Sequence, residues 1–93
     1  MNREQTLATA EELISGDRHR EYGPALAQHS RISGLWSAYL GHDVSPVDVA
    51  MMMVLLKASR IKAGGPAGDS FIDICGYSAL GAEMHDDLAE ANK

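Results

Sequence analysis

Two polar, glycine-marked segments carry residue types that could bind a charged ligand: Gly16–Pro24 and Asp69–Tyr77. Each lies beside an expected helix start, where backbone N–H groups and the helix dipole favour anions. Acids, bases and an aromatic ring brought together at helix ends suit a phosphorylated ligand, and carboxylates can also hold Mg²⁺. We therefore expect one site for a nucleotide-type small molecule. Its candidate ligand-binding residues from these segments are Asp17, Arg18, Tyr22 and Asp73.

The chain between the two segments adds three candidates. Lys57 and Arg60 share a helix face after a long apolar run, and we expect at least one of them to bind phosphate. The alternative is that they are bases near a helix C-terminus, which interact favourably with the helix dipole. His29 falls on an apolar stripe with Ile32 and Trp36. There, a hydrogen-bonded core residue is the alternative to a ligand.

Three carboxylates are candidate metal ligands: Asp48, Asp69 and Asp73. Asp69 and Asp73 are four residues apart and share a helix face. Mg²⁺ needs only one or two carboxylates together with water and substrate phosphates, so three acids would suffice. The alternative for each acid is helix capping. Asp48 could complete a capping box with Ser45, Asp69 could be a cap itself, and Asp73 could be the N3 acid of a helix capped by Ser70. For Tyr22, the alternative is a packing aromatic in a turn.

Length and composition limit the class of protein. The 93 residues fit one domain, 1–93. A formal net charge of −5 argues against binding a long nucleic acid, which needs a basic face. The single Cys75 fits a reducing compartment. The N-terminus has no apolar run typical of a signal peptide, and the longest apolar run, Val49–Leu56, is too short to span a membrane. These features predict a cytoplasmic protein.

Periodicity and end signals predict an all-α, compact four-helix domain. The expected helices run from about Arg3 to Ser15, Pro24 to Leu40, Pro46 to Lys62, and Asp69 or Ser70 to Ala89. Gly16 and Gly41 should end the first two helices, Gly16 in the left-handed conformation. The third helix is apolar nearly all round, so we expect it to be the most buried element.

Self-association is also expected. A domain of this size buries only about 60–65% of its unfolded surface, and only 5% of the residues are aromatic. The apolar surface of the last three helices should exceed what one chain can cover. We therefore predict a homo-oligomer, most simply a twofold dimer or a pair of dimers. Gly76 and Gly81, which weaken the last helix, predict a close approach between helices.

Five blocks of the sequence, which occur in order along most of the chain, carry a family resemblance: Ile14–Arg18, Glu21–Gly23, Leu35–Leu40, Asp48–Lys57 and Asp69–Gly81. Together they resemble an uncharacterised family of small proteins encoded largely by phages and prophages. The resemblance implies a phage or prophage accessory protein that acts in the host cytoplasm.

A second, more distant resemblance rests on the Tyr22-Gly23 turn and the later Asp73-Ile74-Cys75-Gly76-Tyr77. This pattern is similar to the MazG-type, all-α nucleoside triphosphate pyrophosphohydrolases, in which paired acids on two helices hold magnesium against the triphosphate. The chain departs from that pattern, because Met51 and Met52 stand where a second acid beside Asp48 would face the same way.

These observations predict a binder of a nucleotide-like phosphorylated ligand, such as a non-catalytic sponge for a host nucleotide signal with an anti-defence role. One alternative is a Mg-dependent pyrophosphohydrolase, in which Asp48, Asp69 and Asp73 hold Mg²⁺ and Lys57 or Arg60 neutralises developing charge. Another is a structural protein that uses its helices only for interaction. The incomplete acid set favours binding over catalysis.

Overall fold

The computed structural model describes residues 1–92, without the side chains of Asp17 and Tyr22. These residues form five α-helices and no strand: α1 Arg3–Ser15, α2 Asp17–Tyr22, α3 Ala25–Leu40, α4 Pro46–Ala63 and α5 Gly68–Ala91. The all-α prediction and the four expected helices are confirmed. The short helix α2 was not predicted, and it turns the polar Gly16–Pro24 segment into an ordered connection between α1 and α3.

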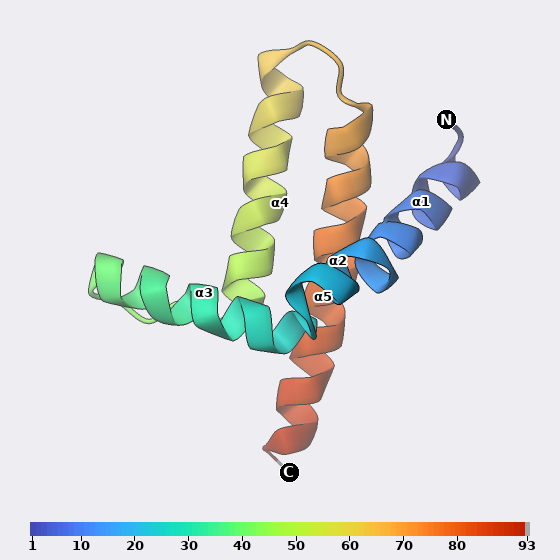
Figure 1. Cartoon of the computed structure of the whole chain (residues 1–93). Coiled ribbons are helices and arrows are strands. Elements are labelled where there is room, and N and C mark those ends of the chain that lie inside the picture. The colour runs from blue at the N-terminus through green and yellow to red at the C-terminus, as the bar shows by residue number, and fades with distance from the viewer. Residues whose placement is uncertain (93) are drawn as a thin grey trace.

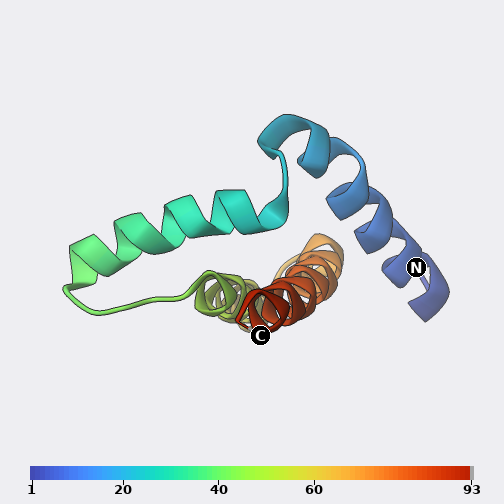
Figure 2. The ribbon, with the colours of Figure 1, turned by 90° about the horizontal axis from the view of Figure 1, so that it is seen from below.

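The helices form two layers. Helices α4 and α5 make an antiparallel hairpin, and α1, α2 and α3 cross one side of it (Figures 1 and 2). Helix α5 packs most extensively against α4 and next against α1, whereas α3 packs mainly against α4. The outer ends of α1 and α3 project away from the hairpin in opposite directions (Figure 2). The radius of gyration is therefore 14.0 Å, against roughly 12 Å for a typical globular domain of this length.

Local signals account for several helix ends. At α4, the Ser45 hydroxyl accepts a hydrogen bond from the Asp48 backbone N–H at 3.0 Å, and the Asp48 carboxylate accepts one from the Ser45 N–H at 3.0 Å. This is the predicted capping box, with Pro46 at the first helical position. Helix α3 ends at Gly41, as expected, and the φ of 67° at this residue is left-handed.

Two predicted ends are wrong. Gly16 has φ −99°, not a left-handed value, because the chain enters α2 directly instead of turning away in a loop. Helix α5 begins at Gly68 with Ala67 as its N-cap, and no side chain there makes a capping hydrogen bond. Asp69 and Ser70 therefore lie inside the first turn of α5. Asp69 faces the positive end of the helix dipole but does not cap it.

The core is small and is centred on α5. The buried apolar residues of the described chain are Ala10, Val49, Ala50, Ile72, Leu80 and Met84. Helix α5 supplies three of them, so α5 and not α4 is the most buried helix of the single chain. The expectation for α4 was wrong because α3 and α5 cover only part of its circumference. On its open side, Met51, Met52, Leu55 and Leu56 are 39–67% exposed.

Gly76 and Gly81, inside α5, mark close helix contacts, as predicted. A Cβ at Gly81 would lie 3.5 Å from the Cβ of Ala50 on α4, and one at Gly76 would lie 3.1 Å from Cγ2 of Ile14 on α1. Both glycines are buried. Among residues 1–92, no helix combines the length and the apolar character that a membrane span requires.

Candidate functional site

Arg18 and Tyr77 form a contact between α2 and α5 across 59 residues of sequence. The Arg18 guanidinium Nη2 donates a hydrogen bond to the Tyr77 hydroxyl at 3.3 Å. The guanidinium carbon also lies 5.2 Å from the centre of the Tyr77 ring, within the range of a cation–π interaction. The aromatic ring therefore holds a planar cation in a fixed place between the two helices.

Lys57 and Asp73 form an ion pair beside this contact. The Lys57 Nζ lies 2.9 Å from the Asp73 Oδ2, and the two side chains are 14% and 35% exposed. Asp73 lies one helical turn before Tyr77 on α5, so the ion pair and the aromatic ring share one face of that helix. The pairing explains how a carboxylate is tolerated on a mostly apolar stripe. The alternative of Asp73 as an N3 cap does not hold, because it stands too far inside α5.

Two cavities meet at Arg18. The smaller, of about 260 Å³, is lined by Leu13, Ile14, Arg18, Glu21, Asp73, Gly76, Tyr77 and Leu80. The larger, of about 520 Å³, shares Ile14, Arg18 and Leu80 with it. Pockets for small molecules and cofactors typically span about 300–1,000 Å³, so the larger cavity falls within that range and the smaller one lies just below it.

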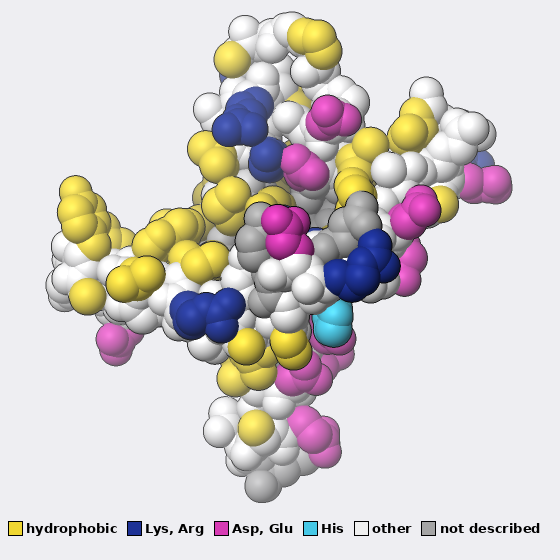
Figure 3. All heavy atoms as spheres, viewed as in Figure 1, with side chains coloured by type: hydrophobic (Ala, Val, Ile, Leu, Met, Phe, Trp, Pro, Cys, Tyr) yellow, Lys and Arg dark blue, Asp and Glu magenta, His cyan; other side chains and the backbone are white. Residues whose placement is uncertain are grey.

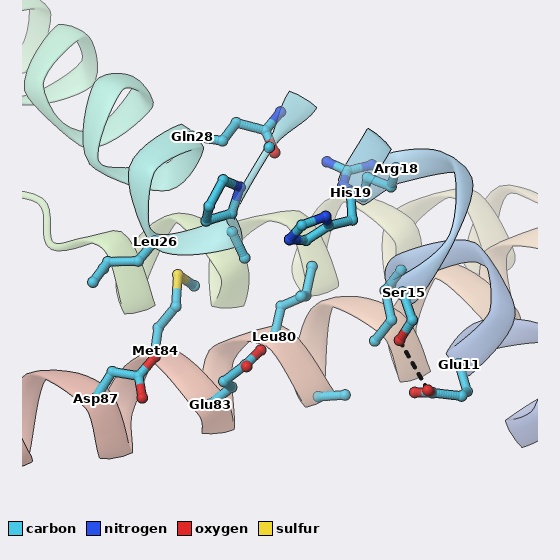
Figure 4. A pocket seen from close by; sticks show the side chains of 15 residues that line it. Glu11, Ser15, Arg18, His19, Leu26, Gln28, Leu80, Glu83, Met84 and Asp87 are labelled. Atoms are coloured by element: carbon cyan, nitrogen blue, oxygen red, sulfur yellow. Dashed lines mark hydrogen bonds between the residues drawn. The ribbon is translucent and has the colours of Figure 1, made fainter. Parts of the chain in front are cut away.

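Figure 4 shows the larger cavity between α2 and α5. Arg18 and His19 lie on one side, and Leu80, Glu83, Met84 and Asp87 lie on the other, with Leu26 and Gln28 of α3 at one end. At the opposite end, the Ser15 hydroxyl donates a hydrogen bond to the Glu11 carboxylate at 2.8 Å. Among the described residues that line this cavity, the permanent positive charge is that of Arg18 on α2, and it faces the carboxylates of Glu11 on α1 and of Glu83 and Asp87 on α5.

His29 is a core residue. It is 1% exposed, and its ring Nδ1 lies 2.8 Å from the Ala25 carbonyl oxygen, with which it can form a hydrogen bond. Burial lowers the pKa of His29 below 6.5, and the positive charge of Arg18 lowers it further, while the backbone hydrogen bond acts in the opposite direction. The core alternative for His29 is the one the geometry supports, since His29 lines neither cavity.

The structure brings together only some of the predicted ligand-binding residues. Arg18 and Asp73 line the smaller cavity together, and Lys57 joins them in one cluster through its ion pair with Asp73, although Lys57 itself lines neither cavity. Arg60 is exposed and lines neither cavity. The predictions for Asp17 and Tyr22 concern side chains outside the described set, and only their positions within α2 are known.

The three predicted metal ligands do not form one site. In the antiparallel hairpin, Ala50 faces Gly81 and Lys57 pairs with Asp73. Asp48, engaged in its capping box, is therefore about 13 Å along the axis from the level of Asp73, and Asp69 is further away still. Within the described part of the chain, no group of three or more His, Cys, Asp or Glu side chains could hold a metal ion. The expectation of a three-carboxylate magnesium site was wrong because two of the acids mark opposite ends of the hairpin.

Two residues of the cluster were not predicted as site residues. Tyr77 is half-buried, lines a cavity and accepts a hydrogen bond from Arg18. Its spacing of four residues from Asp73 indicates that the two residues share one face of the helix. Glu21 lines the same cavity and gave no signal of its own, since its position depends on the unexpected helix α2.

Comparison with known proteins places most of the chain in one family. Residues 5–85 match the family described as Domain of unknown function (DUF6378). The Gene 55 protein of Mycobacterium phage L5 is 46% identical over 79 residues, which are 84% of this chain and 51% of that protein. The Gene 55 protein of Mycobacterium phage D29 is 36% identical over 87 residues, 94% of this chain and 58% of that protein. The chain thus spans little more than half the length of these relatives, and no solved structure matches it.

Proposed function

The chain belongs to the family of small phage proteins described as Domain of unknown function (DUF6378), and on this premise we propose that it binds a nucleotide-like phosphorylated ligand without transforming it. The observation that carries the proposal is the position of Arg18. This cation lines both cavities and is held against Tyr77. A ligand in either cavity would therefore lie against a guanidinium group.

Arginine is well suited to this role. Its planar guanidinium offers several N–H donors in a geometry that matches phosphate oxygens, and these charge-assisted hydrogen bonds are stronger than neutral ones. Contact with an aromatic face reduces the side-chain freedom that binding would otherwise remove. The apolar lining residues Ile14 and Leu80, shared by the two cavities, offer a surface for the less polar part of a ligand.

Lys57 has an indirect part in the same proposal, through its ion pair with Asp73. Its ammonium group has three donors, and its ion pair with Asp73 occupies one of them. Lys57 lines neither cavity, so a phosphate in the smaller one would reach the ammonium group only by displacing the Asp73 carboxylate. Because Asp73 neutralises Lys57 when no ligand is present, we expect Arg18 to contribute more of the affinity than Lys57.

Binding without chemistry is better supported than pyrophosphate hydrolysis. A MazG-type reaction would need paired carboxylates around Mg²⁺, and of the three candidates only Asp73 lines a cavity. Asp73 is also engaged with Lys57. The proposed role is that of a sponge, which holds a host nucleotide signal in the host cytoplasm and so counters a defence response. Such a role requires only stoichiometric binding.

Calorimetric titration of the purified chain tests the proposal. The probes are linear nucleoside triphosphates, cyclic dinucleotides and inorganic phosphate, each with and without Mg²⁺. We expect at least one nucleotide to bind, and Arg18→Gln to weaken its affinity by about 10-fold or more, the value of one charge-assisted hydrogen bond. Arg31→Gln is the matched control, because Arg31 is exposed on α3 and lines neither cavity.

Three outcomes would contradict the proposal. The first is that no nucleotide binds the wild-type chain. The second is that Arg18→Gln, shown to be folded by its helical circular dichroism, binds as tightly as Arg31→Gln. The third is release of pyrophosphate from a triphosphate in the same samples, which would favour the enzymatic alternative.

A further inference from the structure

One side of the molecule exposes a continuous apolar surface over two neighbouring helices. We name it the α3–α4 face and define it by Leu35, Tyr39, Leu40, Met51, Met52, Leu55 and Leu56. These side chains are 39–90% exposed. Figure 3 shows hydrophobic side chains along α3 and along the part of α4 next to it. The two helices pack against each other, and in Figure 3 the hydrophobic side chains of α3 run on to those of α4.

The size of this face matches a stable interface. From their exposed fractions, the seven side chains present on the order of 800 Å², about what each partner contributes to a standard protein–protein interface. Monomeric proteins seldom expose an apolar patch larger than a few hundred Å². The face therefore calls for a partner of comparable size, and not for a small ligand.

The spacing along α4 identifies the kind of partner. The exposed positions Asp48, Met52, Leu55, Ser59 and Lys62 recur at intervals of four and three residues. This is the spacing of a helix seam that packs against another helix. Its two ends carry opposite charges, an acid in the first turn of α4 and a base in the last.

We propose that the α3–α4 face binds a second copy of this chain, with the two α4 helices antiparallel about a twofold axis at Leu55. In this register Asp48 lies opposite Lys62 of the second copy. Met51 and Met52 lie opposite the small residues Ser59 and Ala58. The pairing of opposite charges and the packing of large side chains against small ones each occur twice, because a twofold interface repeats every contact.

The parallel alternative is unfavourable on the same residues. It would place Asp48 against Asp48 and Lys62 against Lys62, and the methionines would meet each other while the small residues left space. Like charges at both ends of a helix pair are repulsive. The seam is therefore complementary to itself only in the antiparallel direction.

Disulfide cross-linking tests the register. In the Cys75→Ala background, which removes the native thiol, Leu55→Cys places the two new thiols on the twofold axis. There the Cα atoms of facing helices can approach the 4.4–6.8 Å that a disulfide needs. We expect a covalent dimer of twice the 10.0 kDa chain mass under mild oxidation. Ser59→Cys is the control, since in this register its two copies lie about 12 Å apart along the axis and should not cross-link.

Light scattering at tens of micromolar tests the face itself. The wild-type chain should be a dimer, and Leu55→Glu should be a monomer because two carboxylates would meet on the axis. Leu7→Glu is the matched control, since Leu7 is 61% exposed on α1 against 67% for Leu55, and it should remain a dimer. A monomeric wild-type chain would overturn the proposal, as would a Leu55→Glu variant that stays dimeric or Ser59→Cys cross-linking as readily as Leu55→Cys. If Leu55→Glu does not fold, the cross-linking pair still decides.

Discussion

At the scale of single residues, the site consists of charges that lie on different helices. Arg18 comes from α2, Lys57 from α4, and Asp73 with Tyr77 from α5. Each base is held by a neighbour: Arg18 by the ring and hydroxyl of Tyr77, and Lys57 by Asp73. Side chains held in this way lose less freedom when a ligand binds, which suits a site whose task is binding.

His29 should make the stability of the chain depend on pH. Its folded pKa lies below 6.5 because it is buried beside Arg18. Above pH 6.5 the histidine is neutral in both the folded and the unfolded chain, and its full contribution to stability is present. As the pH falls from 6.5 toward the lower folded pKa, the unfolded chain gains a proton that the folded chain resists, so the free energy of unfolding decreases.

Urea unfolding of wild type and His29→Gln between pH 7.5 and 5.5 checks this prediction. The wild-type free energy of unfolding should fall by at most about 1.4 kcal/mol per pH unit from this residue. His29→Gln should be less stable at pH 7 but should lack that decrease. His42→Gln, at an exposed position, is the control and should fall as the wild type does. An identical decrease in all three proteins would show that His29 is not the titrating group.

The sequence was informative where a feature depends on neighbouring residues. Arg18 and Asp73 were recognised from their types and from their places beside helix starts, and both line the smaller cavity. Lys57 was recognised from its place after a long apolar run, and it pairs with Asp73. Tyr77 was not predicted as a site residue, because its partner Arg18 is 59 residues away and no local sequence pattern indicates such a contact. Asp48 illustrates the opposite case. The same capping box that identifies the start of α4 also keeps this acid away from Asp73.

At the scale of helices, the same division between local and long-range information holds. The capping box of Ser45 and Asp48 and the left-handed Gly41 fix two helix ends within a few residues of sequence, and both were predicted. The burial of α4 was predicted wrongly, because it depends on how much of that helix the rest of the chain covers. A helix that is apolar nearly all round indicates a buried position, but it does not tell whether the same chain or another one buries it.

Gly76 and Gly81 of α5 should respond differently to alanine. Gly81 has room for a methyl group, because its Cβ would meet Ala50 at an ordinary 3.5 Å. Gly81→Ala should therefore gain up to about 1 kcal/mol in the free energy of unfolding from better helix propensity. At Gly76 the added Cβ would lie only 3.1 Å from Cγ2 of Ile14, which would have to move by a few tenths of an ångström, so the gain should be lost.

Thermal and urea unfolding of the two variants measure this difference, and each variant serves as the control for the other. We expect Gly81→Ala to be more stable than Gly76→Ala by about 1 kcal/mol. Equal stability would mean that Ile14 moves aside at no cost. The α1–α5 contact would then be looser than the spacing between these helices indicates. A gain at Gly76 together with a loss at Gly81 would contradict the packing of both sites.

At the scale of the whole molecule, the small core and the large α3–α4 face have one explanation. Only six apolar side chains are buried within the described chain, while seven large ones are exposed on that face. A chain of this size has a narrow margin of stability. The projection of α3 away from the hairpin, which raises the radius of gyration, widens the surface offered to a second copy. Association would thus bury the apolar side chains of the α3–α4 face, which a single chain leaves exposed to water.

If folding and association are coupled in this way, the melting temperature of the chain should rise with its concentration. A tenfold increase in protein favours the dimer by about 1.4 kcal/mol, which corresponds to an upward shift of a few degrees for a small domain. Differential scanning calorimetry from 10-fold below to 10-fold above the concentration used for light scattering measures the shift.

Leu7→Glu should show the same rise in melting temperature with concentration as the wild type. Leu55→Glu should melt at one lower temperature at every concentration, because the monomer gains nothing from mass action. A wild-type melting temperature that does not change over this range would mean that the single chain is stable without covering its α3–α4 face.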